Sequence, residues 1–90
     1  MARYRCRHDI TADILRALRK HGPLRLSHIA LKANLPLDRA KALLEDMARA
    51  GLIVKDPTSQ RYAITPKGHE WLSLYTMLNE VYTPESTSLL

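Results

Sequence analysis

Three arginines alternate with other residues at the start of the chain, at Arg3, Arg5 and Arg7. In an extended segment, alternate side chains point to the same side, so the three guanidinium groups would form one basic edge. A guanidinium group donates two parallel hydrogen bonds to a phosphate, which makes this segment a candidate arm for a polyanion. The alternative is a charged terminus that is simply solvated.

Further basic residues that could contact phosphate are spread over the rest of the chain. Such contacts orient a protein on a polyanion without reading a sequence. The net charge of +5 fits this use, and residues 69–90 contain no lysine or arginine. The alternative to a phosphate contact is that each residue only keeps the protein surface charged and solvated. The candidates are Arg25, Lys32, Arg39, Lys41, Lys55 and Arg61.

The residue types that carry out catalysis or bind metals do not form a recognisable set. Cys6 is the only cysteine, and zinc needs about four ligands at matched spacing, whereas the four histidines are scattered. Only three glycines are present, which leaves no glycine-rich phosphate loop. We therefore expect no enzymatic activity, metal, cofactor or small-molecule substrate. A redox role for Cys6 stays open because neighbouring arginines favour the thiolate.

The length of 90 residues suits one small domain. Such a chain buries only about 60–65% of the surface that its unfolded form exposes, and no second cysteine is available for a disulfide, so a dimer is an expected source of stability. No apolar run approaches the roughly 20 residues of a membrane span, and no apolar signal segment follows the basic N-terminus. We expect a cytoplasmic protein without membrane contact.

Apolar spacing and turn residues predict four helices and three short strands. Gly22 ends the first helix, and Ser27 is the expected N-cap of the second. Pro36 fits the first turn of the third helix, which Gly51 ends. The expected helices are His8–His21, Ser27–Ala33, Pro36–Ala50 and Pro66–Tyr82, and the expected strands are Leu24–Leu26, Leu52–Lys55 and Arg61–Ile64.

This order of elements is typical of a winged helix-turn-helix domain. The expected fold is mainly α with a small β-hairpin: a three-helix core, a wing and an added C-terminal dimerisation helix. The tight turn before Pro36 leaves the third helix exposed, with the width that a DNA major groove accepts. We expect residues 1–65 to form the winged domain with its basic arm, residues 66–82 the dimerisation helix and residues 83–90 a flexible tail.

An aromatic and apolar stripe on the last helix is the expected dimer interface. The helix would span about 25 Å at 1.5 Å per residue, which is longer than a small three-helix body covers. The alternative is that the stripe packs on the body of the same chain. The stripe consists of Trp71, Tyr75, Leu78 and Tyr82, at heptad-like spacing.

Three segments resemble those of the small archaeal winged-helix DNA-binding proteins, a group whose chromatin-associated members dimerise through a C-terminal coiled-coil helix. The segments are ANL at the helix-turn-helix turn, AGLI between the third helix and the wing, and ITPKG at the start of the last helix. The resemblance extends from about Arg5 to Val81. It implies a homodimer that binds double-stranded DNA as a transcriptional regulator or as a chromatin-associated, nucleoid protein.

By motif position, the resemblance implies a recognition helix from Pro36 and a wing from Lys55 to Arg61. The sequence departs from the pattern because Asp38, Glu45 and Asp46 lie on or near the implied DNA face, and because a proline replaces the expected serine or threonine cap. A protein-interaction module with little or no DNA binding is therefore the alternative, and RNA binding shares the same charge signature. The residues implied to face the groove are Leu37, Asp38, Arg39, Lys41 and Ala42.

Overall fold

The computed structural model describes residues 6–81 as four helices and three strands. The predicted arm residues Arg3 and Arg5, the predicted interface residue Tyr82 and the predicted tail 83–90 lie outside the described residues. In chain order the elements are α1 (Arg7–His21), β1 (Leu24–Arg25), α2 (Leu26–Ala33), α3 (Leu37–Arg49), β2 (Ile53–Asp56), β3 (Arg61–Ile64) and α4 (Pro66–Val81).

The first three helices end at residues that the sequence marks for this role. Gly22 ends α1 with φ +82°, and its N–H donates to the Leu18 carbonyl at 2.9 Å. Asn34 closes α2 in the left-handed conformation, with φ 57°. Gly51 follows α3 with φ 84°, a backbone conformation that glycine adopts without steric cost. The predicted ends of α1 at His21 and α2 at Ala33 are confirmed, whereas α3 ends one residue earlier than predicted, at Arg49, with Ala50 as its C-cap.

Three helix starts differ from the prediction by one residue, those of α1, α2 and α3, and α1 begins at Arg7 instead of His8. The α2 helix begins at Leu26 with Arg25 as its N-cap, so the prediction of Ser27 as the cap is wrong. Because β1 pairs with β3 only at Leu24 and Arg25, the chain turns directly from the strand into the helix. Pro36 is the N-cap of α3 and not part of its first turn, and neither cap residue makes a side-chain capping hydrogen bond.

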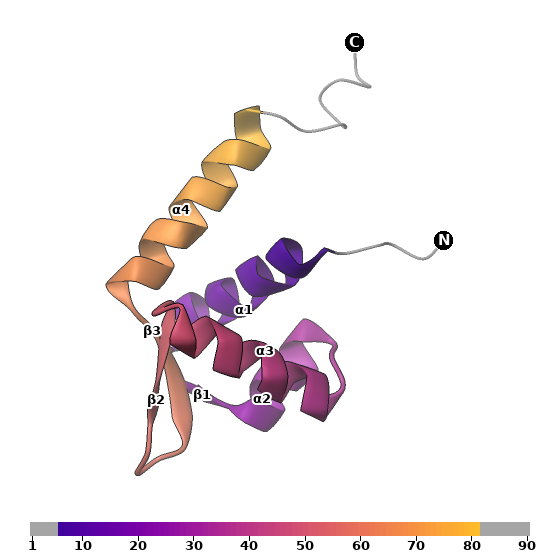
Figure 1. The fold of residues 1–90 in the computed structure, drawn as a ribbon, viewed down its shortest axis with the longest axis vertical. Helices are drawn as coiled ribbons and strands as arrows, with labels where there is room; N and C mark the ends of the chain where they lie inside the picture. Colours follow the sequence, from indigo (N-terminus) through magenta and orange to yellow (C-terminus); the bar gives the residue numbers. More distant parts are fainter. Residues whose placement is uncertain (1–5, 82–90) are drawn as a thin grey trace.

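The three strands form one antiparallel sheet in the order β1-β3-β2, in which β2 and β3 make the hairpin. Asp56 shapes the hairpin turn, since its carboxylate accepts hydrogen bonds from the Thr58 N–H at 3.0 Å and the Ser59 hydroxyl at 2.9 Å. These bonds, led by the one from Thr58, hold the pKa of Asp56 below its ordinary value. The hairpin extends away from the helices as a wing (Figure 1).

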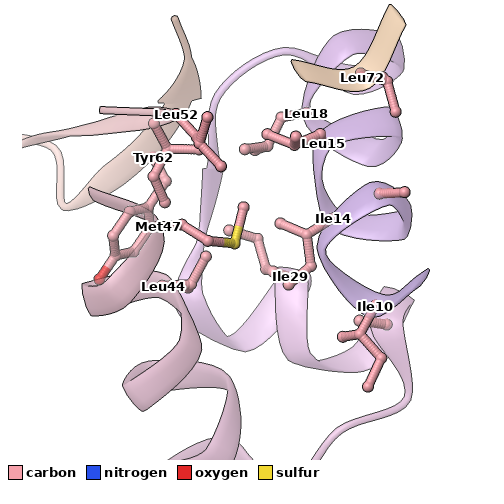
Figure 2. Close-up of a cluster of buried hydrophobic side chains, with 13 residues drawn as sticks. Ile10, Ile14, Leu15, Leu18, Ile29, Leu44, Met47, Leu52, Tyr62 and Leu72 are labelled. Carbon is pink, nitrogen blue, oxygen red and sulfur yellow. The ribbon is translucent and has the colours of Figure 1, made fainter. Parts of the chain in front are cut away.

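The hydrophobic core lies between the helices and the root of the hairpin (Figure 2). Ile14 and Leu15 of α1 are fully buried at its centre, and Leu44 and Met47 bring α3 against it. Leu72 of α4 is fully buried in the same cluster, so the first part of α4 packs as part of the body. Burial of such side chains stabilises each by about 1.5–3 kcal/mol relative to exposure.

The start of α4 is fastened to the junction between α3 and β2. The Thr65 hydroxyl donates to the Gly51 carbonyl at 2.6 Å and accepts from the Gly68 N–H at 3.0 Å, so it caps α4 and ties it to the turn. The Thr65 N–H donates to the Leu52 carbonyl at 3.1 Å. The AGLI and ITPKG segments therefore meet in space, which the sequence motifs by themselves do not reveal.

The second half of α4 leaves the body and extends past the other elements, while α2, α3 and the wing lie toward the opposite end (Figure 1). Within residues 6–81, no helix combines the length and the apolar character that a membrane span needs. The predicted winged-helix fold is confirmed, since four helices and a small antiparallel sheet take that arrangement, while the dimerisation role of α4 stays a prediction.

Candidate nucleic-acid interface

The α3 helix turns one face to the core and the opposite face to solvent. Asp38, Ala42 and Glu45 are exposed along the middle of the outer face. At about 100° per residue, Lys41 and Arg39 fall on the two flanks of this face, and both are exposed. The helix is therefore accessible over its whole outer side, as a helix that enters a groove must be.

The beginnings of α2 and α3 and the wing surround an open hollow of about 410 Å³. Three predicted cations from three different elements line this hollow: Arg25, Lys41 and Lys55. The Lys55 ammonium lies 5.6 Å from the centre of the Tyr62 ring, a cation–π contact that holds it over this face of the wing. Convergence of three positive charges raises the local potential and attracts anions. We call Arg25, Lys41 and Lys55 the cation cluster.

Arg61 lies beside the cation cluster but does not line its hollow. It is directly opposite Arg25 in the β1–β3 ladder and opposite Asp56 in the β2–β3 ladder. Arg61 lines a second hollow on the wing, together with Val54 and Ala63. Arg61 on the central strand thus lies between a residue of like charge on β1 and one of opposite charge on β2.

Arg7 is not part of the cation cluster. Its guanidinium donates to the carboxylate of Asp46 on α3, which also accepts a hydrogen bond from Arg49. The hydrogen bond from Arg7, and then that from Arg49, holds the pKa of Asp46 below its ordinary value. Asp46 is thus neutralised within the chain, and the predicted acidic character of the α3 surface is reduced to Asp38 and Glu45.

The remaining predicted cations occupy other surfaces. Lys32 is exposed in the last turn of α2, and Arg39 is exposed on the flank of α3 away from Lys41. Neither lines the hollow of the cation cluster. Leu37 does line it, and its side chain is 55% exposed.

Two polar residues of the hollow were not predicted as contacts. Ser27 and Gln60 both line it. From the sequence, Ser27 is predicted as a helix cap and not as part of a binding surface. Gln60 is not predicted as a contact because it carries no charge. The positive φ of Gln60, 61°, turns the end of the wing, and no sequence signal identifies that conformation in a glutamine.

The predicted interface residues Trp71 and Tyr75 pack against α1 of the same chain. Their rings stack with centroids 5.4 Å apart, and the His8 ring stacks on Trp71 with centroids 6.1 Å apart. The Tyr75 hydroxyl donates to Asp9, and the Arg16 guanidinium lies 5.8 Å from the Tyr75 ring. Half of the predicted stripe is thereby occupied within one chain, and its role in a dimer stays a prediction.

Replacing Tyr75 with phenylalanine removes the bond to Asp9, and we expect a loss of about 1 kcal/mol, or about 4–8 °C in Tm. This bond raises the pKa of the Tyr75 hydroxyl above its ordinary value. The stabilisation is therefore complete below about pH 10 and disappears as the pH rises through the raised pKa. Urea unfolding of both proteins from pH 7 to 11 measures this difference, and a difference that grows with pH would contradict the bond.

Metal binding has no candidate site in the part of the chain that the structure describes. No three histidine, cysteine or acidic side chains come together between residues 6 and 81. Cys6 is exposed as the N-cap of α1, and its N–H donates to Asp9 at 3.2 Å.

A family model described as winged helix-turn-helix matches residues 4–83. A search of curated proteins found no match. Among solved structures, the chain is similar to the transcriptional regulator Tm0710 from Thermotoga maritima, with a TM-score of 0.66 and 17% identity over 89% of this chain and 66% of that one. It is also similar to a MarR family protein from Bacillus stearothermophilus, with a TM-score of 0.64 and 21% identity over 88% and 64%.

A third similar structure is Sco5413, a MarR family transcriptional regulator from Streptomyces coelicolor, with a TM-score of 0.64 and 24% identity over 91% of this chain and 63% of that one. At these identities the likeness is one of fold. The chain spans about two thirds of the length of these structures.

Proposed function

Because the chain belongs to the winged helix-turn-helix family, we propose that it binds double-stranded DNA as a homodimer and acts as a transcriptional regulator or a chromatin-associated protein. The observation that carries this proposal is the cation cluster beside an exposed α3. The outer face of α3 enters the major groove, and Arg25, Lys41 and Lys55 contact the phosphates along its edge. Bound to DNA in this way, the protein is associated with the nucleoid.

The geometry of the hollow supports phosphate contacts from three elements at once. Arg25 precedes α2, Lys41 lies in the second turn of α3, and Lys55 lies on the wing. Each element is held by the core, so the three charges are positioned before DNA arrives and little ordering entropy is lost on binding. Arg3 and Arg5 would add contacts from the arm, and Arg61 would add one from the wing.

The second half of α4 supports the homodimer. Leu74, Met77 and Leu78 are 60%, 58% and 65% exposed, and all three belong to the second half of α4 by its bounds. This half of α4 extends from the body (Figure 1). Exposure of an apolar surface to water is unfavourable, and the free energy of the system falls when a second copy covers that surface. The exposed residues near the predicted stripe shift the proposed contact toward Leu74 and Leu78 and away from Trp71 and Tyr75.

Fluorescence anisotropy of labelled duplex DNA across a salt series tests DNA binding. We expect micromolar or tighter affinity and a steep fall of log affinity with log salt, at about 0.9 units per phosphate contact. Similar affinity for unrelated duplexes would favour the chromatin role, and a strong preference would favour the regulator. Failure to bind any duplex at low salt would contradict DNA binding and favour a protein-interaction module.

Replacing Leu78 with aspartate is expected to convert the dimer to a monomer, since burial of an unpaired carboxylate at the interface costs several kcal/mol. Sedimentation equilibrium measures the mass of the assembly. Leu31→Asp is the matched control, because Leu31 is 80% exposed and belongs to α2 instead of α4. This variant should keep the mass of the dimer. The fluorescence of Trp71 should change little in the monomer, because the ring stacks with His8 and Tyr75 of its own chain. A Leu78→Asp protein that keeps the mass of the parent would contradict an interface at this part of α4.

A further inference from the structure

The acidic residues of α3 differ in whether the chain itself neutralises them. Asp46 accepts hydrogen bonds from Arg7 and Arg49. Asp38 is exposed in the first turn, and it forms no ion pair or side-chain hydrogen bond with any residue from 6 to 81. Among residues 6–81 the charge of Asp38 therefore has no partner, and it is exposed to a group that approaches α3.

The position of Asp38 relative to the cation cluster limits what that group is. Asp38 follows Leu37, which lines the hollow beside Lys41. In helix-turn-helix proteins the first residues of the recognition helix come closest to the base edges. With Lys41 and Arg25 on phosphate, the first turn of α3 comes close to the base edges, where Asp38 lies on the outer face of the helix and Leu37 lies on the flank toward Lys41.

The chemistry of the groove selects the base. A carboxylate accepts hydrogen bonds and is repelled by phosphate, so it requires an amino group on a base edge. Guanine and thymine present acceptors there, and adenine presents its N7 acceptor beside its amino group. Cytosine presents an amino donor without a neighbouring acceptor of its own, which makes it the partner of choice for a carboxylate.

We propose that Asp38 accepts a hydrogen bond from the amino group of a cytosine, and that Leu37 contacts the methyl group of a neighbouring thymine. The first turn of α3 is then a base-reading element that selects a C·G pair beside a T·A pair. This inference rests on the proposed DNA-binding function and deepens it by naming the chemistry that is read. It also explains why an acid and an exposed leucine stand where phosphate-binding residues are expected.

Selection of bound sequences from a random duplex library tests the proposal. The parent protein is expected to enrich one position for cytosine and a neighbouring position for thymine. In Asp38→Asn the cytosine preference should move to adenine, because an amide both donates to N7 and accepts from the amino group. In Leu37→Ala the thymine preference should disappear while the cytosine preference stays.

Affinity measurements on the enriched duplex give the size of each effect. Replacing the C·G pair with T·A should weaken binding by the parent protein about 5- to 100-fold and that by Asp38→Ala less than about twofold. Replacing the thymine with uracil removes only the methyl group, and it should weaken the parent about fourfold and leave Leu37→Ala unchanged.

Glu45→Gln is the matched control for charge, since Glu45 is exposed on the same outer face nearly two turns away. It removes one negative charge, as Asp38→Asn does, and it should raise affinity for all duplexes equally without changing the selected bases. Thermal unfolding of each variant establishes that it is folded.

The outcomes separate this inference from the proposed function. Salt-dependent binding to every duplex without base enrichment would overturn base reading and leave DNA binding intact. Cytosine enrichment that persists in Asp38→Ala would overturn the role of Asp38. Absence of binding to any duplex would overturn both.

Discussion

Replacing Gly68 with alanine is expected to lower Tm by about 10–25 °C. A Cβ atom at this position would lie 2.2 Å from the Leu52 carbonyl oxygen and 2.8 Å from an Ile64 side-chain carbon. The Leu52 oxygen cannot move away freely, because it accepts the hydrogen bond from the Thr65 N–H. We expect a loss of about 2–4 kcal/mol, and each kcal/mol corresponds to about 4–8 °C in a domain of this size.

The sign of this effect distinguishes packing from helix propensity. Glycine in an open helix is about 0.5–1 kcal/mol less stable than alanine, so propensity alone predicts that Gly68→Ala raises Tm. Lys67→Ala is the control, because Lys67 is the exposed neighbour in the same turn of α4. Thermal unfolding followed by circular dichroism measures both variants, and an unchanged or higher Tm for Gly68→Ala would contradict the close approach of α4 to Leu52.

Neutralising the cation cluster is expected to weaken DNA binding about 100-fold at low salt. The variant combines Arg25→Gln, Lys41→Gln and Lys55→Gln, each of which removes a phosphate contact of about 1 kcal/mol. The slope of log affinity on log salt should decrease in magnitude by about 2–3, since each lost contact removes about 0.9. Anisotropy titrations at several salt concentrations give both quantities.

A second triple variant separates the cluster from net charge. Arg19→Gln, Lys20→Gln and Lys67→Gln remove the same number of charges from exposed residues that do not line the hollow. This variant should keep most of the slope of log affinity on log salt that the parent protein shows. Equal losses in the two variants would show that general attraction, and not the cation cluster, accounts for binding.

Much of the fold could be predicted because its signals are local. The buried stripe of α3 at Ala40, Leu44 and Met47 follows from helical spacing, and the helix ends at Gly22, Asn34 and Gly51 follow from backbone conformations that few residues tolerate. The α2 helix begins at Leu26, one residue before the predicted start at Ser27, because the pairing of Leu24 and Arg25 with β3 sets where the strand ends and the helix begins. That pairing involves β3, which lies more than thirty residues further along the chain.

The candidate site was predictable in its residue types but not in its grouping. Twelve residues were predicted as DNA contacts, and four of them, Arg25, Leu37, Lys41 and Lys55, line one hollow in the structure. Arg7 carries the same charge but is held by Asp46, a partner that no sequence spacing identifies. Arg61 was predicted with Lys55, and both line the second hollow on the wing, but only Lys55 also lines the hollow of the cation cluster.

The sequence by itself determined the elements of this protein, their order and the excess of positive charge, since each of these depends on neighbouring residues or on composition. Only the tertiary structure decided which charges face one another and which are neutralised. Ion pairing, ring stacking and the contact of Gly68 with Leu52 join residues from separate elements, and their distances depend on how those elements pack. The same packing directs Trp71 and Tyr75 toward α1, while Leu74 and Leu78 are exposed because the second half of α4 extends past the other elements (Figure 1).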